Sequence, residues 1–283
     1  MTTATATPAA EPAAHPRPGF GRLLLSEWTK IRTVRSTLWT LILLVVVDLG
    51  FTALLVGVTV AQWDNTNPAD RASVVADPTG FILGSGFFLG QLTICVLGVL
   101  VIASEYSTGM IRASLLAVPK RLPVLWAKAL VFGAVVFVLG VVVSFVSFFI
   151  GSALIGDKAE VSLSDEGVLR AVIGGGLYLA MLGLFALAIG AIVRHTAGGI
   201  TGVIGFVLVL TPLATLLPGS IGDHVSAYLP SQAGQLIAKS AQGENDLLTP
   251  WQPHPRDGRD ARLVPERDAA PAVQPQLAAL QVA

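Results

Sequence analysis

Long apolar runs separated by short polar segments dominate the pattern of this chain. Five runs are long enough to cross a bilayer, namely Leu38–Ala61, Phe81–Ala103, Val124–Ile155, Val168–Val193 and Ala197–Leu217. A helix needs about twenty apolar residues to span a hydrocarbon core of ~30 Å. We therefore expect an all-α polytopic membrane protein with five transmembrane helices, of which the third is long enough to tilt or to project beyond the bilayer.

The segment that precedes the first run has a different pattern. Within residues 20–33, apolar side chains recur at helical spacing, at Phe20, Leu24, Trp28 and Ile31, and polar ones occupy the other face, at Arg22, Ser26, Thr29 and Thr33. This pattern predicts an amphipathic helix in the membrane interface, with Trp28 at headgroup depth and the basic Lys30 and Arg32 toward anionic lipid. The alternative is a cytosolic extension of the first span.

Composition supports a membrane protein. The 283 residues are 53% hydrophobic and only 13% charged, with a mean hydropathy of +0.71, whereas soluble domains carry roughly 25% charged residues. The net charge is zero, so nothing indicates nucleic-acid binding, and the single Cys95 cannot form an internal disulfide. We expect a membrane domain over residues 20–251, between a disordered cytoplasmic tail (1–19) and a disordered Pro/Arg-rich tail (252–283).

The charged loops orient the predicted spans. Basic residues cluster before the first run and around the loop between the second and third runs, and these clusters include Arg22, Lys30, Arg32, Arg35, Arg112, Lys120, Arg121 and Lys128. The loops after the first and third runs are mainly acidic. Because basic residues favour the cytoplasmic side, the amino terminus is predicted to be cytoplasmic, in a multi-pass protein of the plasma membrane.

One strongly ionisable residue, Asp48, lies deep in a predicted span. It is about ten residues from the cytoplasmic end of the first span, and Gln91 lies at similar depth in the second. A charge at the bilayer centre costs roughly 2.5–3.5 kcal/mol on insertion scales, so Asp48 should face other helices and find a partner. We predict a hydrogen bond between Asp48 and Gln91, which would either line a substrate path or hold the two helices together.

No catalytic or metal-binding motif occurs in the sequence. The chain has no Gly-x-x-x-x-Gly-Lys-Ser/Thr loop, so it is not expected to hydrolyse ATP, and it has no His-Glu-x-x-His motif. Ser85 and His195 are predicted on opposite sides of the membrane, which argues against an intramembrane serine hydrolase. We therefore expect no enzyme activity, no metal and no cofactor bound by this chain.

A charged segment follows the second run. Residues 103–112 read Ala-Ser-Glu-Tyr-Ser-Thr-Gly-Met-Ile-Arg, and Pro119 and Pro123 precede the third run. We predict a compact helical loop here, with one or two turns of helix over Met110–Val118. This segment resembles the Glu-aromatic-x-x-Gly-x-x-Arg signature of ABC-2 type transporter permeases, in actinobacterial-type members. Residues 25–32 resemble the elbow helix of that family, and residues 228–235 resemble its external segment after span five. The resemblance covers roughly residues 20–251.

The resemblance implies a role for each matched residue. Glu105 and Tyr106 would form the base of a cytoplasmic coupling helix, Gly109 would make its turn, and Arg112 would meet the ATPase or lipid headgroups. The chain would then be the permease subunit of an ATP-driven export system. ATP and Mg²⁺ would be bound by a separate ATPase chain, and a second permease subunit, identical or related, would complete the substrate path.

The sequence departs from that family near its end. Such permeases normally have six spans, but no stretch in residues 252–283 is apolar enough to cross a bilayer. Two explanations of the missing sixth span are open: a frameshift or truncation, and a genuine five-span variant. The functional alternatives are a degenerate permease that binds an ATPase without transport, and a non-transport membrane protein such as a sensor partner. The sequence indicates no substrate.

Overall fold

All regular secondary structure in the described part of the chain is helical. The computed structural model describes residues 19–111, 121–216, 229 and 236–237. The helices are α1 (Phe20–Thr33), α2 (Arg35–Ala61), α3 (Pro68–Ala76), α4 (Pro78–Ser107), α6 (Arg121–Ile155), α7 (Val168–Val193) and α8 (Thr196–Thr215). Short 3-10 turns follow α2 at Trp63–Asn65 and α6 at Gly156–Lys158.

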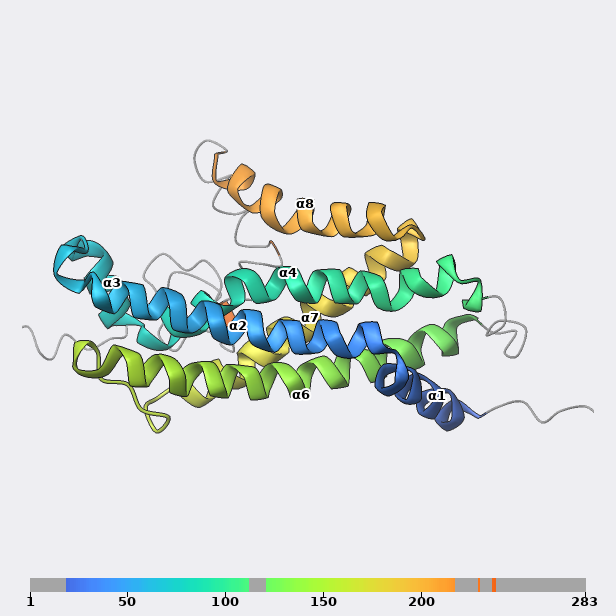
Figure 1. The fold of residues 1–283 in the computed structure, drawn as a ribbon, viewed down its shortest axis with the longest axis horizontal. Coiled ribbons are helices and arrows are strands. Elements are labelled where there is room, and N and C mark those ends of the chain that lie inside the picture. Colours follow the sequence, from blue (N-terminus) through green and yellow to red (C-terminus); the bar gives the residue numbers. More distant parts are fainter. Residues whose placement is uncertain (1–18, 112–120, 217–228, 230–235, 238–283) are drawn as a thin grey trace, which may run out of the picture. The chain divides into compact units, whose positions relative to one another are not determined.

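Helix α4 is central to the bundle. It packs against α2, α6, α7 and α8, while α6 also packs against α2 and α7. Figure 1 shows α2, α4 and α6 running alongside one another, with α1 near the beginning of α2. The chain reverses between successive long helices, so α2 and α6 begin where α4 and α7 end. We refer to this end, where α1 lies, as the α1 end of the bundle.

The prediction of an all-α fold is confirmed for the described residues, and the lengths and hydropathy of the helices are those of a multi-pass membrane protein. Four helices are long and apolar enough to cross a membrane: α2, α4, the segment Leu122–Lys158 that includes most of α6, and α7. The fifth predicted span, Ala197–Leu217, overlaps α8, whose described apolar stretch (Thr196–Leu210) is shorter than a membrane crossing requires. The fifth span therefore stays a prediction. The predicted tails 1–19 and 252–283, and nearly all of the segment 228–235, lie outside the described residues.

The polar segment between α2 and α4 contains a helix that the apolar pattern did not predict. Helix α3 begins after Asn67, whose side-chain oxygen accepts a hydrogen bond from the Ala69 backbone N–H at 3.0 Å. Helix α4 begins in the same way, because Asp77 accepts from the Gly80 N–H at 2.9 Å. In both helices a proline follows the capping residue and fits the first turn, where no backbone donor is needed.

Candidate functional site: a buried ion-pair cluster

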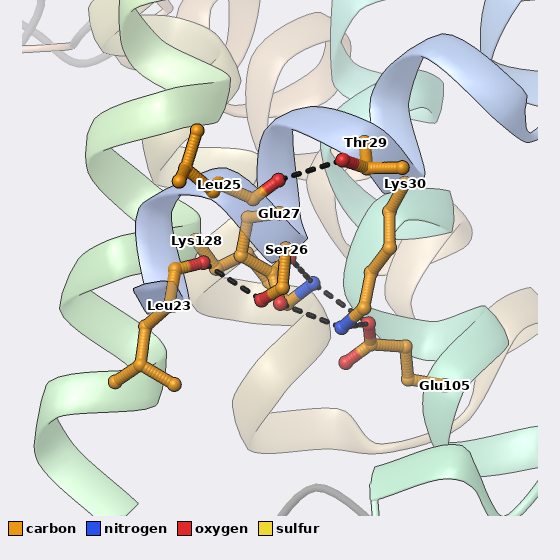
Figure 2. A network of polar contacts seen from close by, with 8 residues as sticks. All are labelled: Leu23, Leu25, Ser26, Glu27, Thr29, Lys30, Glu105 and Lys128. Carbon is orange, nitrogen blue, oxygen red and sulfur yellow. Dashed lines mark hydrogen bonds and ion pairs between the residues drawn. The ribbon is translucent and has the colours of Figure 1, made fainter. Parts of the chain in front are cut away.

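Four charged side chains meet at the α1 end of the bundle. Glu27 and Lys30 are one turn apart on α1, so they lie on the same side of that helix. Lys30 Nζ donates to Glu27 Oε1 at 2.6 Å and to Glu105 Oε1 of α4 at 2.9 Å. Lys128 Nζ of α6 donates to Glu27 Oε2 at 2.7 Å and to Glu105 Oε1 at 2.9 Å. Figure 2 shows the resulting alternation of acid and base across the three helices.

Most of this cluster is removed from solvent. Glu27, Glu105 and Lys128 are 4%, 5% and 3% exposed, and Lys30 is the more accessible member. Burying an ion costs several kcal/mol unless a counter-charge and hydrogen bonds compensate for the lost hydration. With two acids and two bases the cluster is formally neutral, so each charge has compensation. One carboxylate oxygen, Glu105 Oε2, is buried without a hydrogen-bond partner.

Lys30 is stabilised in its charged form by the two glutamates. Partial burial by itself lowers the pKa of Lys30, but the hydrogen bonds and negative charges of Glu27 and Glu105 outweigh that effect. The pKa of Lys30 therefore lies above its ordinary value of 10.5.

The residues after Glu105 connect the cluster to another part of the bundle. The ring of Tyr106 lies under the guanidinium of Arg194, 5.8 Å from the ring centroid, and Arg194 ends α7 in a left-handed conformation. Helix α4 ends at Ser107, and Gly109 then adopts φ +72°, which favours glycine. Gly109 therefore lies in a turn, and its role in a coupling helix stays a prediction. Arg112 lies outside the described residues.

The predicted amphipathic segment is a helix. Trp28 is 45% exposed and Ile31 is buried, and the buried Glu27 was not among the residues that the prediction named. The interfacial depth of Trp28 stays a prediction. Lys30 was expected to point toward lipid, and instead it faces Glu105. Glu27 and Glu105 place two carboxylates on this side of α1, and Lys30 donates to both. Arg32 remains at the surface, 5.9 Å above the Trp28 ring.

Asp48 is fully buried, at a contact of α2 with α4 and α6. Its Oδ1 accepts a hydrogen bond from Ser147 Oγ at 3.0 Å, while Oδ2 has no hydrogen-bond partner. Gly86 and Gly90 make room for the carboxyl, because a Cβ on Gly86 would lie 2.5 Å from Oδ1 and one on Gly90 would come closer still to Oδ2. The Gly-x-x-x-Gly spacing of α4 thus permits close helix packing.

The predicted hydrogen bond between Asp48 and Gln91 is wrong. Gln91 accepts from the Tyr178 hydroxyl of α7 at 2.7 Å and donates to the Phe88 backbone oxygen at 3.3 Å. Successive helix positions are about 100° apart, so Gly90 faces Asp48 while Gln91 points toward α7. The two residues therefore join different helix pairs, and the close packing at Asp48 favours an interhelical role over a substrate path.

Sequence reasoning did not select Glu27 and Lys128 as site residues. Lys128 lies inside the predicted third span, so the argument that selected Asp48, namely that ionisable residues in spans are expensive to bury, applied to it as well. Glu27 stands three residues before Lys30, a spacing typical of helical ion pairs. The sequence thus contained a signal for each residue, but it could not show that Glu27 and Lys30 of α1 meet Glu105 and Lys128 in the folded protein.

Comparison with known proteins does not assign this chain to a family. The chain matches none of the protein-family models, curated proteins or solved structures with which it was compared.

Proposed function

We propose that this chain is the permease subunit of an ATP-driven export system, and that a separate ATPase chain docks at the segment around Gly109. The support comes from the adjacent residues Glu105 and Tyr106, which precede this segment. Glu105 contacts α1 and α6 through Lys30 and Lys128, and Tyr106 contacts Arg194 at the end of α7. Movement of the segment would therefore be passed directly to α1, α6 and α7.

The proposed mechanism uses the ion pairs as mechanical links. ATP and Mg²⁺ bind to the ATPase chains, whose closure displaces the docked segment and with it the end of α4. Separating Glu105 from Lys128 would remove one of the two ion pairs that each of these buried charges makes, and losing a buried ion pair costs up to about 3–5 kcal/mol. The ends of α1 and α6 therefore follow α4. This proposal assigns the α1 end to the cytoplasm and requires a second permease subunit for the substrate path.

The test compares two glycines with similar surroundings. Gly109 and Gly156 both have positive φ (+72° and +52°), and a Cβ at either position would meet no atom within 4 Å. They lie at opposite ends of the bundle, before and after α6. Proline cannot adopt a positive φ, so Gly109→Pro and Gly156→Pro impose comparable local distortions on different loops. The measurement is co-purification of the tagged chain with an ATPase from its host, followed by ATP hydrolysis assays.

The proposal expects an ATPase with a nucleotide-binding loop to co-purify with the wild type and with Gly156→Pro, but not with Gly109→Pro. Absence of such an ATPase from the wild-type preparation would overturn the proposal. An associated ATPase whose hydrolysis drives no export in vesicles would instead identify a degenerate permease.

A further inference from the structure

An apolar groove lies on the surface of the bundle, between α2 and α6. It has a volume of about 780 Å³ and is open on its outer side. Its walls are formed by residues between Leu38 and Val45 of α2 and between Leu130 and Val142 of α6, all of them Leu, Ile, Val or Ala. At the α1 end it is bordered by Leu24, Leu25 and Trp28. An open apolar groove of this size on a membrane-spanning bundle needs an apolar occupant.

The length of the groove matches one leaflet of a bilayer. On α6 the lining runs over thirteen residues, from Leu130 to Val142, and the twelve rises between them make about 18 Å of helix. One leaflet contributes roughly 15 Å, or half, of the hydrocarbon core. A membrane-spanning helix of a second subunit is about 30 Å long, so it would extend well beyond the groove. A lipid acyl chain from the leaflet next to α1 has the required length and ends where the groove ends.

Basic side chains lie at the α1 end of the groove. The Arg32 guanidinium sits over the ring of Trp28, which lines the groove. Arg35 begins α2 three residues before the groove residue Leu38, on the same side of the helix, and is exposed. All ion pairs among the described residues belong to the neutral cluster around Glu105, so neither arginine has an acidic partner there.

We propose that this groove binds one anionic phospholipid of the leaflet next to α1. Its acyl chain lies along α2 and α6, and its phosphate lies beside Arg32 and Arg35, with Trp28 at the boundary between chain and headgroup. An uncharged or zwitterionic headgroup would leave the two arginines without a net counter-charge. This inference needs only the membrane-spanning fold and holds whether or not the chain couples to an ATPase.

The test measures lipid retention by native mass spectrometry of the full-length chain. The protein is released from micelles with equal amounts of phosphatidylglycerol and phosphatidylcholine that carry identical acyl chains. The wild type is expected to retain one phosphatidylglycerol preferentially. The double variant Arg32→Gln, Arg35→Gln should lose roughly tenfold of that preference. The matched control, Arg71→Gln with Arg170→Gln, changes two arginines in α3 and α7 and should keep it.

A second pair of variants tests the acyl-chain part of the site. Ala134 and Ala153 are both exposed on α6, but only Ala134 lines the groove. Ala134→Phe should abolish the tightly retained lipid, whereas Ala153→Phe should not. Equal retention of both lipids by the wild type, or equal effects of the two phenylalanines, would overturn the proposal. A lipid-free dimer that Ala134→Phe dissociates would show that a second copy fills the groove instead.

Discussion

Glu105 and Asp48 are both buried carboxyl groups at helix contacts, yet their surroundings differ. Glu105 accepts hydrogen bonds from two ammonium groups, those of Lys30 and Lys128, at 2.9 Å each. Asp48 accepts one from the neutral hydroxyl of Ser147 and lies against Gly86 and Gly90. The structure compensates the charge of Glu105, whereas at Asp48 it mainly provides space.

This difference separates two ways of holding membrane helices together. The cluster at Glu105 joins α1, α4 and α6 through charges, at the bundle end where a soluble partner is proposed to act. The contact at Asp48 joins α2, α4 and α6 by packing of the Asp48 side chain against two glycines of α4 and by one neutral donor on α6. Changes in charge should therefore affect mainly the first region, and changes in side-chain volume should affect mainly the second.

The largest effect is expected from Lys128→Met. This substitution leaves Glu27 and Glu105 buried with only Lys30 between them, and loss of one partner of a buried ion pair costs about 3–5 kcal/mol. Thermal unfolding of the protein in detergent micelles measures the loss. Lys158→Met changes an exposed lysine beyond the other end of α6, so it should stay within about 0.5 kcal/mol of wild type. Equal effects would mean that the cluster does not stabilise the bundle.

A smaller effect is expected from Gly90→Ala. Its Cβ would overlap the Asp48 carboxyl, and overpacking of this kind costs about 1–3 kcal/mol. The control is Gly84→Ala in the same helix, where a Cβ meets nothing within 4 Å. Combining Gly90→Ala with Asp48→Ala should restore part of the loss, because the shortened side chain vacates the space. Failure of Asp48→Ala to compensate would contradict close packing at this contact.

The smallest effect concerns pH. The pKa of Lys30 is raised above 10.5, so its contribution to stability is complete below that pH and is lost as the pH rises through the higher folded-state value. The unfolding temperature of the wild type should fall above about pH 10.5 more steeply than that of Lys30→Arg, because arginine stays charged there. Identical profiles for the two proteins would show that Lys30 does not contribute through its charge.

The sequence predicted the lengths of the helices better than their rotations. Length and hydropathy located four spans, because a bilayer imposes about twenty apolar residues on any helix that crosses it. The same reasoning placed Asp48 and Gln91 at similar depth but could not show that they face different helices. Spans that are apolar on nearly all sides carry little information about which side is buried.

The candidate site was predicted only in part, because it too depends on which sides of the helices face one another. Glu105 and Gly109 were identified through a family resemblance, and Lys30 through its position in an amphipathic segment. The ion pairs that join Lys30 and Lys128 to Glu105 connect residues 75 and 23 positions apart. Such contacts depend on how three helices pack, and a single sequence does not record that packing.

The most direct test of the two-region account is a pair of carboxyl-to-amide substitutions measured by thermal unfolding in detergent. Glu105→Gln removes the negative charge that balances Lys30 and Lys128, so we expect a loss of about 3 kcal/mol or more. Asp48→Asn keeps the size of the side chain and an oxygen that accepts from Ser147, and no cation bound to Asp48 is left without its partner. We expect it to be neutral or stabilising, within about 1 kcal/mol. Equal losses in the two variants, or a larger loss at Asp48, would contradict the account.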